Sequence, residues 1–171
     1  MKFSTRARYG LRMMVELARL QQSENLVQLK RIAKITGLSN NYLGQLAISL
    51  KDDGLLLGVS GKNGGYKLSR APEEITLRQI IRAVQGPILV TDCVANPDQC
   101  LNAEFCEART IWVLVSEKIQ ELLEEFSLAD LIDKNWMKRV REENQSSSFL
   151  IVENLMRQKD ESEGPGCALQ R

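Results

Sequence analysis

Apolar residues recur at helical spacing from the start of the chain. The first such stretch follows Ser4, whose hydroxyl can cap the free amides at the start of a helix. The apolar face of this predicted helix consists of Leu11, Met14, Val15 and Ala18. We therefore expect the chain to open with an amphipathic helix that packs on a core.

Two shorter helices are predicted next. One covers residues 29–36 and ends at Gly37, because glycine readily takes the left-handed conformation that closes a helix. The other follows Ser39 as N-cap and covers residues 40–51. Its inward face is expected to contain Leu43, Leu46, Ala47 and Leu50. Two short helices separated by a glycine turn are typical of a helix-turn-helix.

Residues 55–59 and 66–68 have the composition of two short strands, and the glycine-rich residues 60–65 connect them. This pattern predicts a β-wing. The loop lacks the Lys-Ser/Thr and the downstream helix start of a phosphate-binding loop, which disfavours nucleotide binding. A further helix is expected over residues 77–85, capped by Thr76 and closed by Gly86.

The second half of the chain contains an aperiodic stretch and then a long helix. Residues 89–105 show no periodicity, so we expect a loop there. The following helix has apolar residues at spacings of three and four: Trp112, Val115, Ile119, Leu122 and Phe126. We favour packing of this stripe on a second copy of the chain over packing on its own core. One more helix is predicted from the Ser127–Asp130 cap to near Glu143.

The expected fold is mainly α: a winged helix-turn-helix with a two-stranded β-wing, plus a long dimerisation helix. The predicted organisation is a winged domain at 1–88, a cysteine-bearing segment at 89–107, the dimerisation helix and following helix at 108–143, and a polar tail at 144–171.

Charge is distributed unevenly along the 171 residues. Residues 1–90 contain 14 Lys/Arg and 6 Asp/Glu, whereas residues 91–171 contain 9 and 16. A basic domain joined to an acidic part favours binding to a polyanion, although an ordinary solvated surface is the alternative. No apolar run approaches the roughly 20 residues that span a bilayer, and no secretory signal is recognisable, so we expect a cytoplasmic protein without a membrane partner.

A helix-turn-helix presents the start of its second helix to the major groove of DNA. The residues expected there are Ser39, Asn40, Asn41, Tyr42 and Gln45. Asparagine and glutamine can hydrogen-bond base edges, and Tyr42 can contact a phosphate or a thymine methyl group, although helix capping alone would also explain Ser39 and the asparagines. The wing adds Lys62 and Asn63 near the minor groove. Phosphate contacts are expected from Arg6, Arg8, Lys30, Arg31 and Lys34.

Three cysteines, Cys93, Cys100 and Cys106, lie within fourteen residues, with six and five residues between them. Thiolates suit iron–sulfur clusters or zinc, but the short C-x2-C pairs of a typical zinc site are missing. The chain contains no histidine, so a fourth protein ligand would be a carboxylate, a backbone group or Cys167. The nearest carboxylates are Asp92, Asp98, Glu104 and Glu107. Redox-active thiols and incidental cysteines remain as alternatives.

Several segments together carry a resemblance to known regulators: residues 1–10, 32–39, 42–46, 54–55, the wing at 59–68 and the three-cysteine segment. Over residues 1–132 the chain resembles the bacterial IscR, NsrR, RirA and CymR regulators. The resemblance implies a homodimer with paired long helices, and a [2Fe–2S] or [4Fe–4S] cluster on Cys93, Cys100 and Cys106, of which we favour [2Fe–2S].

The chain departs from this family at functional positions. The first cysteine gap is one residue longer than in IscR, and Arg109 stands where IscR has a histidine. Arg8 occupies the region where NsrR-like proteins have an acidic residue. Gly44 replaces a glutamate that discriminates between operators, and Ser60 replaces a minor-groove arginine. The fourth ligand and the operator preference therefore do not transfer.

The function expected from the sequence is a transcription regulator that binds a double-stranded DNA operator with an affinity set by the cluster. The alternative is a cluster-free regulator of the same fold that responds through thiol oxidation or a protein partner. An enzyme or electron carrier is disfavoured because no acid–base pair or small-molecule substrate pocket is recognisable.

Overall fold

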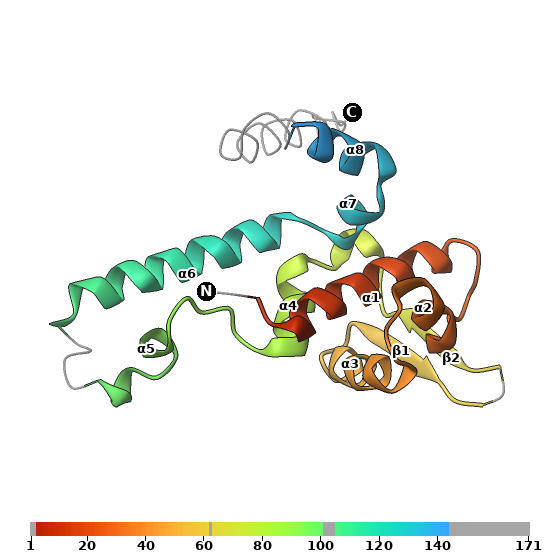
Figure 1. The fold of residues 1–171 in the computed structure, drawn as a ribbon, viewed down its shortest axis with the longest axis horizontal. Helices are drawn as coiled ribbons and strands as arrows, with labels where there is room; N and C mark the ends of the chain where they lie inside the picture. Colours follow the sequence, from red (N-terminus) through yellow and green to blue (C-terminus); the bar gives the residue numbers. More distant parts are fainter. Residues whose placement is uncertain (1–2, 62, 101–104, 144–171) are drawn as a thin grey trace, which may run out of the picture. The chain divides into compact units, whose positions relative to one another are not determined.

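The computed structural model describes residues 3–61, 63–100 and 105–143, and the chain divides into two compact units, residues 1–132 and 133–171 (Figure 1). The described elements are α1 (Thr5–Gln21), α2 (Leu29–Thr36), α3 (Asn40–Asp52), β1 (Leu56–Val59), β2 (Gly65–Leu68), η1 (Pro72–Glu74), α4 (Leu77–Gln85), α5 (Asp92–Ala95), η2 (Pro97–Gln99), α6 (Glu107–Glu125), α7 (Leu128–Ile132) and, in the second unit, α8 (Lys134–Glu143).

The predicted ends of the first helices are confirmed by their caps. The hydroxyl of Ser4 accepts a hydrogen bond from the amide of Ala7 at 3.1 Å, and that of Ser39 accepts one from Tyr42 at 3.2 Å. Gly37 ends α2 in the left-handed conformation, with φ +73°. These two serines and this glycine satisfy the hydrogen bonds of free amides and carbonyls at the helix ends. The helix boundaries therefore follow from short sequence motifs.

The core lies around α1, which packs against α2, α3, α4, α7 and the wing. Met13, Met14 and Leu17 of α1 are completely buried. The four residues expected on the inward face of α3 are all buried: Leu43, Leu46, Ala47 and Leu50. On α1, Met14 and Ala18 are buried as expected, and the half-buried Leu11 and Val15 pack at the edge of the same core.

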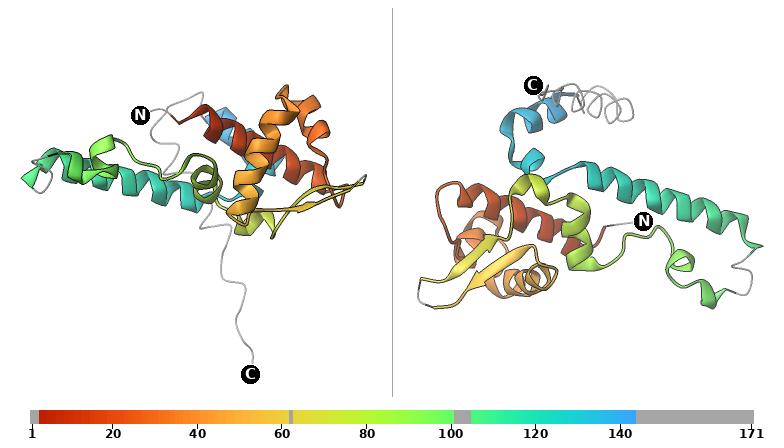
Figure 2. Two further views of the ribbon diagram at one scale, coloured as in Figure 1. Left: turned by 90° about the horizontal axis from the view of Figure 1, so that it is seen from below. Right: turned by 180° about the vertical axis from the view of Figure 1, so that it is seen from behind.

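The wing is a two-stranded antiparallel hairpin in which Leu56 pairs with Leu68 and Val59 with Gly65 (Figure 2). An isolated bridge joins Val27 to Tyr66, with amide-to-carbonyl distances of 2.9 Å in both directions. The predicted winged helix-turn-helix is therefore confirmed, and strand β2 of the wing is held to the segment that precedes α2.

Helix α1 packs tightly against α4 at Gly10. A Cβ atom placed on Gly10 would lie 3.0 Å from both γ-carbons of Val84, which is itself buried. Only a residue without a side chain fits this crossing without displacing Val84.

Gly10→Ala is expected to lower the free energy of unfolding by about 1–2 kcal/mol, because overpacking outweighs the gain in helix propensity. Urea denaturation measures this difference. Gly44→Ala is the matched control: the added Cβ would meet no atom within 4 Å. This control is expected to gain about 0.5–1 kcal/mol, as alanine replaces glycine inside a helix. Equal stability of the two variants would contradict the close approach at Gly10.

Two expectations for the second half need correction. Residues 89–105 were predicted to be a loop, but they contain the short helical turns α5 and η2. Such turns are too short to leave a periodic pattern in the sequence. The helix expected from Ser127 to near Glu143 is broken at Asp133, whose carboxylate accepts the amides of Asn135 and Trp136 at the start of α8.

The predicted cap before α7 is confirmed: the Asp130 carboxylate accepts both the amide and the hydroxyl of Ser127, at 2.7 and 2.8 Å. Backbone hydrogen bonds tie this region to the segment before α4: Leu77 donates to Phe126, and Leu128 donates to Ile75. Within the described residues, no helix is both long and apolar enough to cross a bilayer.

Candidate nucleic-acid interface and cysteine segment

Helix α3 separates a buried face from an exposed polar face. Its inward leucines pack in the core, whereas Asn40, Asn41 and Gln45 are exposed, as is the capping residue Ser39. Amide side chains on an exposed helix face can donate to and accept from base edges. The structure therefore places four of the five predicted base-reading residues on one accessible surface.

Tyr42 has a different environment from the other four. It is half-buried, and its ring meets that of Tyr9 edge-on, with centroids 6.0 Å apart and planes at 88°. This aromatic pair joins α3 to α1. Packing explains the position of the ring, and contact with nucleic acid stays a prediction.

The predicted phosphate-contacting residues divide into two groups. Arg6 donates from Nε to the Val84 carbonyl at 2.8 Å and from a terminal nitrogen to the Ser49 hydroxyl at 3.0 Å, and Arg31 pairs with Glu24. Both therefore have structural partners that the sequence did not reveal. Lys30 and Lys34 are exposed on α2.

Arg8 lies beside the tyrosine pair, with its guanidinium carbon 5.8 Å from the centroid of the Tyr9 ring. The Arg8 side chain remains exposed. A cation–π contact of this kind orients the guanidinium and leaves its hydrogen-bond donors accessible.

At the tip of the wing, Asn63 is exposed, while Lys62 lies outside the described residues. A Cβ atom on Gly64 would lie 2.2 Å from the Val59 carbonyl oxygen, so the tip requires glycine there. The closely folded backbone explains why the sequence places glycines on both sides of these two polar residues.

Ile48 was missed by the sequence analysis. It is 59% exposed and follows Gln45 by three residues, so it continues the exposed face of α3. Its spacing from Asn41 and Gln45 could have shown that Ile48 lies on the same exposed face of the helix. It was overlooked because apolar residues were assigned to the core.

The three cysteines lie on different elements. Cys93 is half-buried in α5, Cys100 is exposed directly after η2, and Cys106 is the half-buried N-cap residue of α6. In the described part of the chain, no three Cys, Asp or Glu side chains are close enough together to hold a metal ion. Glu104 and Cys167, considered as fourth ligands, lie outside the described residues.

A family model named Rrf2, with the description "Iron-dependent Transcriptional regulator", matches residues 3–134. The chain belongs to the Rrf2 family. This Rrf2 protein is 38% identical over 131 residues to the HTH-type transcriptional regulator CymR of Bacillus subtilis, covering 77% of this chain and 89% of CymR. It is 33% identical over 140 residues to the regulator IscR of Aliivibrio salmonicida, covering 82% of each.

Solved structures lead to the same two groups of regulators. The structure of CymR, the global cysteine regulator of B. subtilis, superposes with a TM-score of 0.64 at 36% identity, covering 77% of this chain and 96% of that one. T. potens IscR superposes with a TM-score of 0.61 at 32% identity, covering 88% and 96%. The family resemblance and the winged-helix fold expected from the sequence are confirmed, and this Rrf2 protein is a transcriptional regulator of a DNA-binding family.

Proposed function

We propose that this protein binds a double-stranded DNA operator through α3 and the wing. The observation that carries the proposal is the polar, exposed face of α3, with Asn40, Asn41 and Gln45 opposite a fully buried apolar face. A helix of this kind fits the major groove. The basic first half of the chain supplies the electrostatic attraction to phosphate.

Gln45→Ala is expected to weaken binding to the preferred duplex by roughly 10- to 100-fold, since one base-edge interaction contributes about 1–3 kcal/mol. The duplex is selected by the protein from a random-sequence pool, and fluorescence anisotropy gives the affinity. A scrambled duplex should show a much smaller change.

Lys34→Ala is the control for a phosphate contact. It should weaken both duplexes alike and reduce the salt dependence by about one ion. Should Gln45→Ala leave the affinity for the selected duplex unchanged, α3 is not the reading element.

We further propose that two copies of the chain pair through α6. Ile111 and Leu114 are 55% and 51% exposed on this helix. The helical repeat puts Ile111, Val115 and Leu122 on one face, turned away from the buried Ser116.

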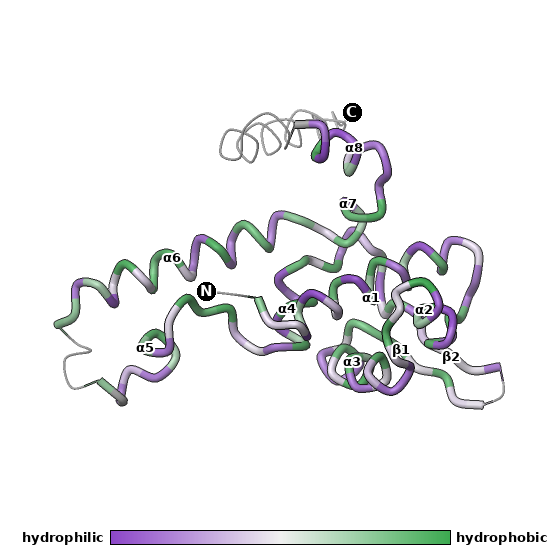
Figure 3. Tube along the Cα trace, viewed as in Figure 1, coloured by the Kyte–Doolittle hydropathy of each residue, from purple (hydrophilic) through white to green (hydrophobic). Residues whose placement is uncertain are grey.

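Lys118 lies on the same face of α6. Its hydrogen bond with Glu121 raises the pKa of Lys118, and the negative charge of Glu121 adds to this effect. Figure 3 shows apolar and polar segments alternating along α6.

The other face of α6 packs on the chain's own core. Ile119 and Leu123 pack against a small cluster of Ala7, Ile81 and Ile88. Ile119 was expected in the dimer seam, but in the structure it faces inward. The seam we propose is therefore rotated toward Ile111, Val115 and Leu122.

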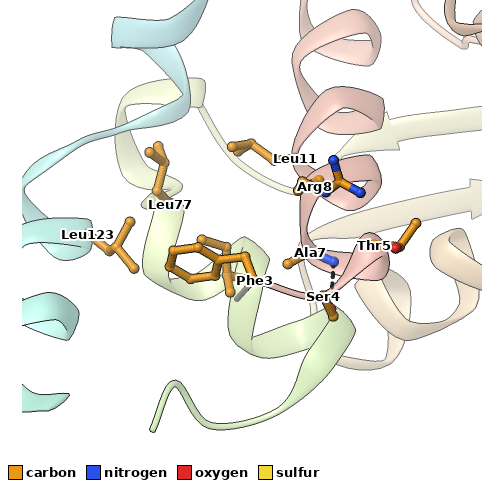
Figure 4. Close-up of a pocket in the computed structure, with 9 residues that line it drawn as sticks. Phe3, Ser4, Thr5, Ala7, Arg8, Leu11, Leu77 and Leu123 are labelled. Carbon is orange, nitrogen blue, oxygen red and sulfur yellow. Dashed lines mark hydrogen bonds between the residues drawn. The ribbon is translucent and has the colours of Figure 1, made fainter. Parts of the chain in front are cut away.

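An apolar recess opens beside the end of α6, on the inward side of the helix. It has a volume of about 740 Å³, and its lining includes Phe3, Leu11, Leu77, Ile81 and Leu123 (Figure 4). In an antiparallel pair related by a two-fold axis, the first half of one α6 runs along the last half of the other. The exposed residues near Ile111 would then lie along the partner's α6 near Leu122, on the side of that helix away from the recess.

We propose that Cys93, Cys100 and Cys106 hold an iron–sulfur cluster, with [2Fe–2S] favoured. The donor chemistry fits, since three cysteines in one short segment supply the soft thiolates that such clusters require. When bound, the cluster supplies a centre that responds to iron or redox conditions. The segment joins α4 to α6, and the Ser116 hydroxyl accepts the Val90 amide at 3.1 Å. Ordering this segment would therefore favour one relative orientation of the two winged domains in the proposed dimer.

A second candidate is a cluster-free regulator that responds to thiol oxidation. The similarity to CymR favours it, as does the match to a Staphylococcus aureus CymR structure described as the oxidized form, at 32% identity and a TM-score of 0.62. The exposed thiol of Cys100 is accessible to an oxidant.

Isolation of the protein without oxygen separates the two candidates. A cluster protein should be coloured, with iron and sulfide in stoichiometric amounts. Colourless protein that takes up no iron, and whose DNA binding changes on treatment with hydrogen peroxide, would favour the second candidate and contradict the first.

A further inference from the structure

Arg109 connects the start of α6 to the cysteine in α5. It is half-buried in the first turn of α6, and its Nε donates to the carbonyl oxygen of Cys93 at 3.0 Å. A hydrogen bond from a charged donor is stronger than one between neutral groups. The backbone at Cys93 is therefore fixed to a residue sixteen positions later in the chain.

The side chain of Cys93 has a partner as well. Its sulfur lies 3.1 Å from the hydroxyl oxygen of Thr91, the residue that precedes α5. Cys93 is thus held at its carbonyl and at its sulfur. Cys100 is instead exposed, and its hydrogen bond to the described residues runs from its amide to the Pro97 carbonyl, at 3.1 Å.

Cys106 begins the same helical turn that contains Arg109. Residues three apart on a helix are neighbours, with Cβ atoms about 5–6 Å apart. Since Arg109 donates to Cys93, it joins the backbone at Cys93 to the helical turn that Cys106 begins.

We infer that Arg109 is a positioning residue that holds the backbone at Cys93 to the first turn of α6 in the metal-free protein. One proposed ligand, Cys93, is thus held in place in advance, and because no three Cys, Asp or Glu side chains of the described residues lie close enough together to hold a metal ion, the segment has to rearrange to bind a cluster. The role of Arg109 in metal binding rests on the proposed cluster, whereas its positioning of Cys93 does not depend on the cluster.

Hydrogen–deuterium exchange on the metal-free protein tests the positioning directly. Arg109→Met keeps an apolar stem but removes the donor. It is expected to speed exchange of the two hydrogen-bonded amides of this turn, those of Val94 in α5 and of the following Asn96, roughly tenfold. Exchange in α2 should stay unchanged and serves as internal reference. Arg109→Lys restores a charged donor and should stay within about threefold of the wild type.

Arg82→Gln is the matched control, because Arg82 is an exposed arginine that pairs with Asp53 on another surface. It should leave exchange in α5 unchanged. Wild-type exchange in Arg109→Met would overturn the inference. Equally fast exchange in the Met and Lys variants would overturn it too, since a restored charged donor would then have no effect on α5.

Iron release provides the second readout. After anaerobic loading, Arg109→Met should lose its visible absorption to a chelator about tenfold faster than wild type, and Arg109→Lys should resemble wild type. Wild-type release from Arg109→Met would overturn the role toward the metal. If the wild-type protein takes up no iron, the cluster proposal fails, while the exchange experiment still decides the role of Arg109.

Discussion

Replacing Ile111 and Leu114 together by glutamate is expected to convert the proposed dimer into a monomer and to weaken operator binding by at least roughly a hundredfold. Both side chains are about half exposed on α6, so the unpaired chain should tolerate the change. In a dimer the four added carboxylates would be crowded together at the seam between the two α6 helices, where burying like charges is costly. Losing the second reading helix removes the avidity of two linked sites, typically 100- to 10,000-fold.

Sedimentation velocity gives the mass, and anisotropy with the selected duplex gives the affinity. Ile35→Glu is the control for oligomeric state, because Ile35 is similarly exposed, at 48%, but lies on α2. This control should remain dimeric. A double variant that sediments like the wild type would show that α6 is not the pairing helix.

Replacing Cys100 by alanine is expected to reduce bound iron to less than about a tenth of the wild-type amount after anaerobic loading. A cluster held by three protein thiolates loses a direct bond to iron with each cysteine removed. Because Cys100 is exposed, the substitution should not disturb folding. Iron analysis together with the visible spectrum measures the loss.

Asn96→Ala is the matched control for Cys100→Ala. Asn96 is an exposed residue of the same segment and carries no thiol. This variant should load iron like the wild type. Full iron content in Cys100→Ala would remove this cysteine from the ligand set and leave the segment without three thiolates.

The first half of the fold was predictable because its signals are local. Ser4, Gly37, Ser39 and Thr76 act within four residues of their own positions, and each is found at the helix end where it was expected. The buried face of α3 likewise follows from the spacing of its leucines. Caps and periodicity fixed these elements without knowledge of the tertiary structure.

Long-range contacts were not predictable from such signals. Arg6 hydrogen-bonds the carbonyl of Val84, 78 residues away, and the inward orientation of Ile119 depends on a cluster from α1, α4 and the following segment. The sequence shows only that a residue is charged, and this is equally true of a residue that contacts a phosphate and of one that caps a helix end. Only the folded arrangement separates these roles.

The cysteine segment lies between these two cases. The spacing of Cys93, Cys100 and Cys106 predicts thiolate chemistry, because residue type determines which metals are preferred. It does not predict the turns α5 and η2 or the contact from Arg109. Those depend on how the segment packs on the first turn of α6, which leaves no periodic signal in the sequence.

In the proposed mechanism a cluster on the cysteine segment sets the operator affinity. The most direct measurement is the dissociation constant for the selected duplex, taken without oxygen on one preparation before and after its iron is removed by a chelator. The two dissociation constants should differ at least about tenfold, equivalent to 1.4 kcal/mol of coupling. Equal values for the two forms, or a freshly isolated protein without iron, would contradict it.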